Sequence, residues 1–256
     1  MAGSKKAGPG DPPALRVSNP AGGRLRIASP DGPRPVALEA AAVVLPPGGA
    51  QSSTAVLSAR SEVVPFLDHR GQLRQLVKWC TSREPCSVRI LTGAPGIGKT
   101  RLGVRLCQEV GRRGWLAGLL ATTEDTDAVE ALAEARTARL VFVDGANHHE
   151  NVLVAAAQVA AQASPNHPVR IVFTVRSDTQ AAGGRGAAWE LRNRIDARLG
   201  SRLAEVEVIA ELDPVARRKL YAGAFRTFAD RPAGPVRRQP PPPRLTSPGT
   251  RNRSQW

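Results

Sequence analysis

The chain lacks several features that would place it in a membrane or in an oxidising compartment. It has only three cysteines, Cys80, Cys86 and Cys107, an odd number without the spacing of a metal site. No apolar run reaches the roughly 18 residues of a membrane span, and the N-terminus has no apolar signal-peptide core. These absences predict a cytoplasmic protein without a membrane anchor, in which Cys107 is a small core residue.

Proline is scarce in the middle of the chain. Residues 61–230 contain six prolines, against nine in residues 1–60 and seven in residues 231–256. Because segments rich in proline and glycine rarely build a packed core, we predict one folded unit over 61–230. The first 60 residues are then a largely disordered Gly/Pro/Ala-rich segment, with a short apolar run over 36–45, and 231–256 is a disordered Pro/Arg-rich tail. A small regulatory module within 1–60 is the less favoured alternative.

Acidic residues are also scarce at both ends, so the net charge of +14 is unevenly distributed. Residues 1–60 carry seven basic and three acidic side chains, and residues 231–256 carry six basic and no acidic ones. Such tails predict a weak, nonspecific and salt-sensitive affinity for nucleic acid. Arginine far outnumbers lysine in a chain rich in alanine, glycine and proline, and a GC-rich coding bias explains this better than a selected nucleic-acid surface.

Residues 93–100 fit the phosphate-binding loop pattern G-x-x-x-x-G-K-[ST] at every fixed position. Its glycines allow the positive φ angles that turn backbone N–H groups toward a phosphate chain. We expect Lys99 to bind the β- and γ-phosphates of ATP and the Thr100 hydroxyl to bind Mg²⁺. A glycine-rich turn without chemical function is the alternative. The expected nucleotide-binding residues of the loop are Gly93, Ala94, Pro95, Gly96, Ile97, Gly98, Lys99, Thr100 and Arg101.

The pattern around this loop supports the motif, because strands and helices alternate along the chain. We expect strands over 87–92, 115–120, 140–143, 169–175 and 206–212. Helices are expected over 73–80, 99–110, 127–135, 152–163, about 187–195 and from residue 213 onward. This alternation predicts an α/β fold, a parallel sheet sandwiched by helices, as in a P-loop NTPase core.

Asp144 follows the apolar strand expected over 140–143, which is the Walker B arrangement. Because the carboxyl ends of parallel strands meet at one edge of a sheet, Asp144 is expected to face the loop and hold Mg²⁺ through water. An aspartate that caps the following turn is the alternative. Gly145 stands where many P-loop ATPases have a catalytic Glu, so we expect slow hydrolysis. Glu150 and the pair at 148–149 are candidate replacements, whereas adjacent histidines are poorly spaced for a metal site.

Several segments together resemble the nucleotide-binding core of actinobacterial STAND-type, AAA-related P-loop ATPases, over residues 61–230. They are Val64-Pro65-Phe66, the segment around Trp79, and residues 88–93, 98–102, 114–120 and 212–214. The resemblance implies ATP or dATP with Mg²⁺, a switch role, and homo-oligomers or protein partners in full-length relatives. Relatives often carry a Gly-Arg-Glu-x-Glu-Leu box where residues 68–73 here differ. Their helical lid, winged helix and sensor repeats have no counterpart, so we expect a truncated or frame-shifted member.

The resemblance also implies a sensor for the γ-phosphate near the end of the strand expected over 169–175. AAA-like ATPases use a polar residue there, which makes Thr174 and Arg176 the candidates. A plain surface arginine is the alternative for Arg176. The expected catalytic residues are therefore Lys99, Asp144 and Arg176, with Thr100 and Asp144 at the metal and Thr174 at the nucleotide.

The leading hypothesis for the function is an ATP-binding switch with weak hydrolysis. Two alternatives belong to other classes: a nucleic-acid-binding protein that works through its basic tails, and a non-functional remnant of an ATPase. A small-molecule kinase is less favoured, because no lid arginines or acceptor site can be recognised.

Overall fold

The structure is a computed structural model that describes residues 23–29, 32–43, 58–68, 71–121, 123–145, 150–176, 186–200, 204–209 and 211–229. In this part of the chain the strands are β1 (Arg24–Ile27), β2 (Arg34–Glu39), β3 (Cys86–Gly93), β4 (Leu116–Leu120), β5 (Arg139–Val143), β6 (Val169–Arg176) and β7 (Ala204–Val208). The helices are α2 (Gln72–Cys80), α3 (Lys99–Gly111), α4 (Thr126–Glu134), α5 (Glu150–Ala161), α6 (Gly186–Leu199) and α7 (Pro214–Ala229).

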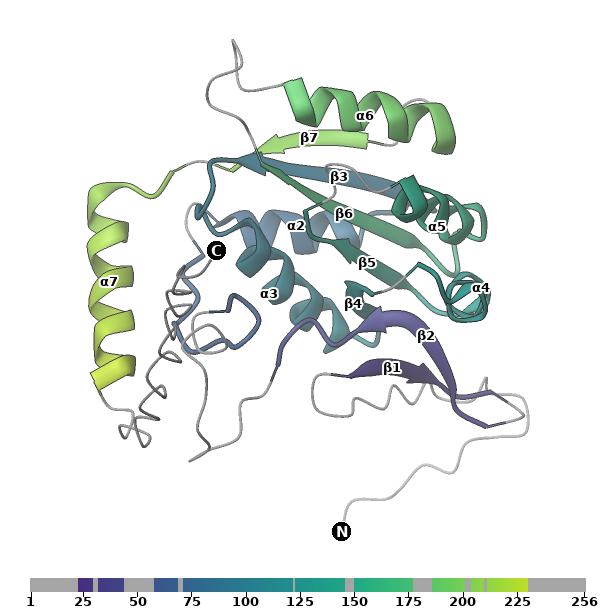
Figure 1. Ribbon diagram of the computed structural model, residues 1–256, viewed down its shortest axis with the longest axis horizontal. Helices are drawn as coiled ribbons and strands as arrows, with labels where there is room; N and C mark the ends of the chain where they lie inside the picture. The colour runs from purple at the N-terminus through teal and green to yellow at the C-terminus, as the bar shows by residue number, and fades with distance from the viewer. Residues whose placement is uncertain are drawn as a thin grey trace, which may run out of the picture.

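The described strands form one sheet in the order β1-β2-β4-β5-β6-β3-β7 (Figure 1). The five strands from β4 to β7 in this order are parallel, and β3 pairs with β6 over its whole length. Successive residues of a strand face opposite sides of the sheet. On β5, Val141 and Val143 therefore join the core under α4, α5 and α6, while Leu140 and Phe142 join the core under α2 and α3. The expected α/β sandwich is confirmed.

The direction in which the chain moves along the sheet reverses at β3. From β3 it passes through α3 to the distant strand β4 and then returns one strand at a time to β6. Right-handed crossovers in opposite directions place their helices on opposite faces, which explains why α3 lies on one face and α4, α5 and α6 on the other. Ligand sites of open α/β sheets lie at such a reversal, beyond the carboxyl ends of the strands, and here residues 93–98 occupy that place.

The N-terminal hairpin differs from the sequence-based expectation that residues 1–60 are largely disordered. Strands β1 and β2 pair antiparallel, and β2 pairs antiparallel with β4 through Leu38 and Leu120. Val36 and Leu38 are 0% exposed. Gly118 allows this close approach, because a Cβ there would lie 2.4 Å from the carbonyl oxygen of Glu39. The apolar run had been noticed, but its partner lies far along the chain and no local pattern identifies it.

The last two elements also depart from expectation. The strand expected over 206–212 ends at Val208, and β7 begins earlier, at Ala204. Helix α7 starts where predicted, because the Asp213 carboxylate accepts hydrogen bonds from the N–H groups of Val215 and Ala216 at 2.9 and 2.8 Å. Its apolar residues, however, do not enter a core. The expected tail at 231–256 lies outside the described residues.

A buried arginine stabilises the end of the sheet that lies opposite the 93–98 loop. Arg139, at the first position of β5, is 1% exposed. Its Nη1 donates to the carbonyl oxygens of Leu132 and Ala133 at the end of α4, and its Nη2 donates to those of Gln162 and His167 beyond α5. Burial lowers the pKa of this guanidinium to about 10, so it stays charged at neutral pH and stabilises both helix ends.

The contact between α3 and β5 yields a test of the packing. A Cβ on Gly103 would lie 2.2 Å from the ring of Phe142, which is 1% exposed, whereas a Cβ on Gly111 of the same helix would meet nothing within 4 Å. We expect Gly103→Ala to lower the free energy of unfolding by about 1–3 kcal/mol through overpacking. Gly111→Ala is the matched control and should leave it unchanged or raise it by less than about 1 kcal/mol. Urea unfolding monitored by circular dichroism measures both, and equal midpoints would contradict the packing.

Candidate functional site

The loop between β3 and α3 has a backbone conformation that suits an anion. Gly96 and Gly98 have φ angles of 76° and 102°, which residues with a Cβ adopt only with strain. Gly98 is the N-cap of α3 and makes no side-chain capping hydrogen bond. The first N–H groups of a helix have no intrahelical acceptor, so those of α3 remain available to an anion and add the positive end of the helix dipole.

Lys99 lies over this loop and is 8% exposed. Its Nζ donates to the carbonyl oxygens of Gly93 at 2.7 Å and Ala94 at 2.9 Å. Burial lowers the pKa of Lys99; the Asp144 carboxylate opposes this shift and the Arg176 guanidinium adds to it. A buried ammonium that is held only by carbonyl oxygens gains electrostatic energy from an incoming anion. A phosphate at the loop would therefore restore the charge stabilisation that burial removes.

Asp144, just beyond β5, meets two hydroxyl groups. The Thr100 hydroxyl donates to it, with Oγ1 lying 3.0 Å from both Oδ1 and Oδ2. The Thr174 hydroxyl donates to Oδ1 at 2.5 Å and accepts the N–H of Gly145 at 2.9 Å. The sheet thus brings together one residue from each of the three places that the sequence predicted, at the ends of β5 and β6 and at the start of α3.

The oxygen atoms of this cluster fit a magnesium ion. Mg²⁺ prefers oxygen ligands, keeps several of its waters, and is usually held by one or two carboxylates together with substrate phosphates. The carboxylate of Asp144 and the hydroxyl of Thr100 supply such a set beside the uncapped start of α3. When bound, the ion would neutralise phosphate charge at this point. The described residues contain no group of three or more His, Cys, Asp or Glu side chains that could hold a metal by themselves.

The remaining candidates lie at different distances from this cluster. Arg176 pairs with Gly93 in the register of β6 and β3 and is exposed at the edge of the loop, close enough to lower the pKa of Lys99. Glu150, considered as a substitute for the missing catalytic Glu, is instead paired with Arg194 at 2.5 Å and with Arg198. It is therefore an α5–α6 contact. Residues 148 and 149 lie outside the described part of the chain.

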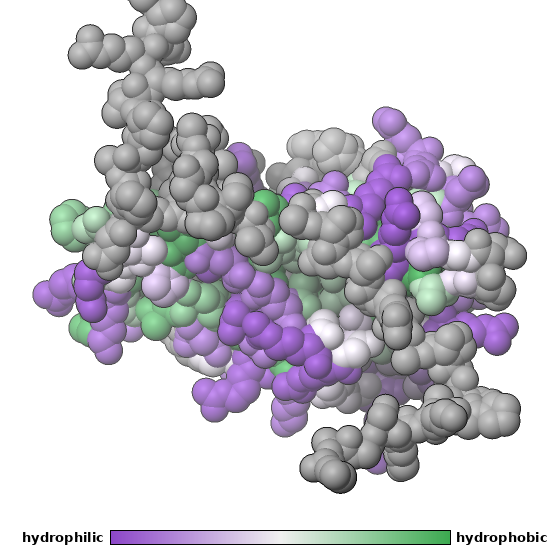
Figure 2. All heavy atoms as spheres, turned by 90° about the horizontal axis from the view of Figure 1, so that it is seen from below, coloured by the Kyte–Doolittle hydropathy of each residue, from purple (hydrophilic) through white to green (hydrophobic). Residues whose placement is uncertain are grey.

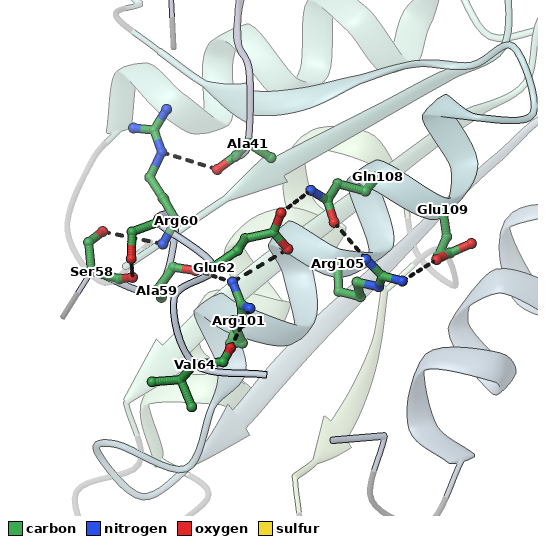
Figure 3. A network of polar contacts seen from close by, with 11 residues as sticks. Ala41, Ser58, Ala59, Arg60, Glu62, Val64, Arg101, Arg105, Gln108 and Glu109 are labelled. Atoms are coloured by element: carbon green, nitrogen blue, oxygen red, sulfur yellow. Dashed lines mark hydrogen bonds and ion pairs between the residues drawn. The ribbon is translucent and has the colours of Figure 1, made fainter. Parts of the chain in front are cut away.

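Arg101 directs its side chain away from the loop, so only its backbone N–H is available to a ligand there. Its Nη1 donates to the carbonyl oxygen of Ala59 at 2.9 Å and its Nη2 to that of Val64 at 2.8 Å (Figure 3). We call residues 58–66 the strap. Sequence reasoning missed this contact, since no spacing rule connects a helix to a segment some forty positions earlier. The opposite charges of Arg101 and Glu62 were the only signal.

The expectation that Cys107 is a core residue is confirmed. Cys107 is 3% exposed in the core under α2 and α3 and, like Cys80 and Cys86, is free. Burial raises the pKa of Cys80 to about 12, which keeps this thiol protonated and unreactive at neutral pH. None of the helices in the described ranges combines the length and hydrophobicity that crossing a membrane requires.

The solved structures that resemble this chain do so at low sequence identity. No protein-family model and no curated protein sequence matches the chain. Among solved structures, a DNA replication initiation factor is 14% identical with a TM-score of 0.44, covering 64% of this chain and 54% of that chain. A Walker-type ATPase of Pyrococcus abyssi is 14% identical, with a TM-score of 0.41 and coverages of 65% and 60%. AMPPCP-bound DnaA from Aquifex aeolicus is 15% identical, with a TM-score of 0.41 and coverages of 64% and 54%.

This chain therefore spans little more than half of the length of these solved structures. Its mostly parallel sheet, covered by helices on both faces, with a phosphate-binding loop between β3 and α3, is a P-loop NTPase fold.

The contact between Asp144 and Thr100 predicts which residue confers dependence on the metal. We expect Asp144→Asn to remove the additional thermal stabilisation that Mg²⁺ gives to ATP-bound protein, because an amide is a poorer Mg²⁺ ligand than a carboxylate. Stabilisation by ATP in EDTA should remain. Asp127→Asn, on the exposed first turn of α4, is the control and should behave as wild type. Thermal melts with ATP in Mg²⁺ or in EDTA measure this, and an unchanged Mg²⁺ increment in Asp144→Asn would refute the assignment.

Proposed function

We propose that the protein binds Mg-ATP at residues 93–100 and acts as a nucleotide-dependent switch with weak hydrolysis. One observation carries the proposal: the uncapped N-terminus of α3, the buried Lys99 and the Thr100–Asp144–Thr174 cluster meet at one point. Backbone N–H groups, a lysine and a hydroxyl beside an aspartate are the parts that cradle the phosphates and the metal in P-loop NTPases. Lys99, Asp144 and Arg176 are the residues proposed to act on the γ-phosphate, and Thr174 the one proposed to sense it.

Weak hydrolysis follows from the surroundings of Asp144. A P-loop ATPase needs a residue that orients or activates the attacking water, yet Gly145 follows Asp144 directly. Glu150 pairs with Arg194 and Arg198 on α6, and a carboxylate engaged by two guanidinium groups is held away from the task of orienting a water. Binding and release of the nucleotide are then better suited to a switch than fast turnover is.

The finer proposals rest on the resemblance to actinobacterial STAND-type ATPases. That resemblance favours ATP or dATP, and assembly with protein partners or further copies of the chain. The cytoplasmic location is proposed from the few cysteines and the lack of a long apolar run. Lys99 and its neighbours follow the pattern of these relatives closely, whereas residues 68–73 depart from the box that precedes their first strand.

Nucleotide binding is tested by the stability of the folded protein. A ligand that binds only the native state adds RT ln(1 + [L]/Kd), about 2.7 kcal/mol at a ligand concentration of 100 Kd. We expect Mg-ATP to raise the melting temperature of the wild type more than Mg-GTP does, and we expect Lys99→Ala to lose most of the increase. Lys78→Ala on α2 is the control lysine and should keep it. Equal shifts in Lys99→Ala and wild type would rule out this loop as the site.

A nucleic-acid-binding function is a second candidate, which α7 favours. Of the basic tails to which the sequence analysis assigned this function, residues 1–22, 44–57 and 231–256 lie outside the described residues, and three of the described arginines in 1–60 pair with carboxylates. Helix α7 itself carries Arg217, Arg218, Lys219 and Arg226 and no acidic residue, and its Tyr221 and Phe225 are 68% and 77% exposed. On the side that Figure 2 shows, hydrophobic and hydrophilic residues lie together at the left end of the molecule, where Figure 1 places α7. Cationic side chains with exposed aromatic rings suit single-stranded nucleic acid.

The role of α7 in such binding can be separated from that of the tails. If α7 contacts phosphates, the full-length Arg218→Gln, Lys219→Gln double variant should bind a fluorescent oligonucleotide more weakly at low salt. On a single-stranded oligonucleotide the slope of log K against log[salt] should become shallower by about 1.4, because each phosphate contact contributes about 0.7. Arg112→Gln with Arg113→Gln, at the end of α3, is the control of equal charge change. Equal slopes in the two double variants would exclude α7 and leave the tails as the source of any affinity.

A further inference from the structure

The strap connects the first turn of α3 to two other parts of the molecule. Arg101 directly follows Thr100, and its guanidinium bridges the carbonyl oxygens of Ala59 and Val64 near the two ends of the strap. The Arg101 side chain is 17% exposed and also pairs with Glu62 at 3.5 Å. A planar guanidinium donates from two nitrogen atoms in a rigid fork, whereas an ammonium group donates from a single nitrogen on a flexible stem. The position of the strap is thus tied to the orientation of one side chain in the first turn of α3.

The backbone of the strap is held under strain at Glu62. Its φ angle is 55°, and it is the one non-glycine residue with positive φ in the described ranges. A residue with a Cβ adopts this conformation only at a cost in free energy, and it persists only where its surroundings enforce it. Here the carboxylate lies between Arg101 and Gln108, whose Nε2 donates to it at 2.5 Å. Arg105 donates to Gln108 in turn at 3.2 Å (Figure 3). Side chains of α3 therefore maintain the strained turn.

A second arginine fastens the strap to the N-terminal hairpin. Arg60 donates to the carbonyl oxygens of Ala40 at 2.7 Å and Ala41 at 3.2 Å, and its Nη2 lies 3.1 Å from the carboxylate of Glu39. Its own carbonyl oxygen accepts the N–H of Val43 at 2.8 Å. These bonds join the strap to the end of β2, a strand that pairs with β4 at the far side of the parallel sheet.

The other end of the strap reaches α7. Pro65 follows Val64, the residue whose carbonyl oxygen Arg101 holds, and a Cβ placed on Gly223 of α7 would lie 3.8 Å from the ring of Pro65. Phe66 then packs against the core under α2 and α3. The strap therefore contacts α3 and the hairpin and lies beside α7, three parts of the chain that are far apart in sequence.

From these contacts we propose that Arg101 is a positioning residue that couples occupancy of the phosphate-binding loop to the N-terminal hairpin and α7 through the strap. The inference rests on the proposed nucleotide binding. A phosphate bound by the first N–H groups of α3 fixes the turn that carries Arg101, and the fixed guanidinium holds Ala59 and Val64 in place together. Without the ligand the same turn is freer, and the strained backbone at Glu62 favours release of the strap.

Hydrogen exchange of the full-length protein, with and without saturating Mg-ATP, tests this coupling. In the wild type we expect Mg-ATP to slow amide exchange at least about fivefold in residues 58–66 and 214–229, the lower end of typical allosteric coupling. Arg101→Met should still show a thermal shift with Mg-ATP but should lose the slowing in both segments. Arg112→Met removes an arginine from the exposed end of α3 that pairs only with Glu109, and it should respond as wild type does.

The outcomes separate the coupling from the proposed function. If Mg-ATP caused no thermal shift in the wild type, both the proposed nucleotide binding and the coupling would be refuted. A thermal shift without slower exchange in the strap, or slowing that persists in Arg101→Met, would overturn the coupling alone. Should Arg101→Met fail to fold, Arg101→Lys replaces it. This variant keeps the charge but lacks the rigid two-nitrogen fork that bridges the two carbonyl oxygens. We therefore expect Mg-ATP to slow exchange in the strap and α7 less than in the wild type. Slowing equal to that of the wild type would refute the proposal.

Discussion

The structure depends on the close approach of backbone to backbone at the carboxyl end of β3. A Cβ on Gly93 would lie only 3.1 Å from the carbonyl oxygen of Ile209, so a larger residue would crowd this point. The chain then turns through residues 94–98 into α3, whose N-terminus has no side-chain cap. That turn leaves N–H groups unpaired and draws Lys99 onto the loop. The full-length pairing of β3 with β6 then brings Thr174 and Arg176 beside it, and β5 adds Asp144 from the next strand.

The buried cationic side chains differ between the two ends of the sheet. Arg139 and Arg170 are almost fully buried, and each finds its acceptors mainly among backbone carbonyl oxygens. A guanidinium that satisfies several carbonyl oxygens in a fixed geometry is a structural group. Lys99 is buried in the same way but contacts only two carbonyl oxygens of its own loop. A flexible ammonium with two such partners can exchange them for a phosphate. The buried arginines thus stabilise the end of the sheet where β5 and β6 begin, and the buried lysine lies at the opposite end, at the proposed nucleotide site.

Local patterns predicted the parts of this site that lie on contiguous sequence. The loop, α3 and the strands that end at Asp144 and Arg176 each carry their signal within a dozen residues, and the parallel topology brings them together. The hairpin of β1 and β2 carried no such signal, because Val36 and Leu38 become buried only against β4. The pairing of Glu150 with Arg194 and Arg198, and the bridge from Arg101 to the strap, likewise join segments about forty positions apart. Side-chain partners at that distance are set by the folded topology, which a single sequence does not encode in any periodicity.

The distribution of buried surface decides which parts a bound nucleotide could move. The sheet is fixed, since its five inner strands are paired on both sides and two cores cover its faces, and typical coupling energies of about 1–3 kcal/mol cannot rearrange it. Helix α7 is different: Ala216 is its only buried residue, and Gly223 lies beside Pro65 of the strap. With so little apolar area holding it, the position of α7 depends on a few contacts. A coupling energy of this size therefore acts on α7 before it acts on the sheet, and the strap is the path by which occupancy of the proposed nucleotide site would reach this helix.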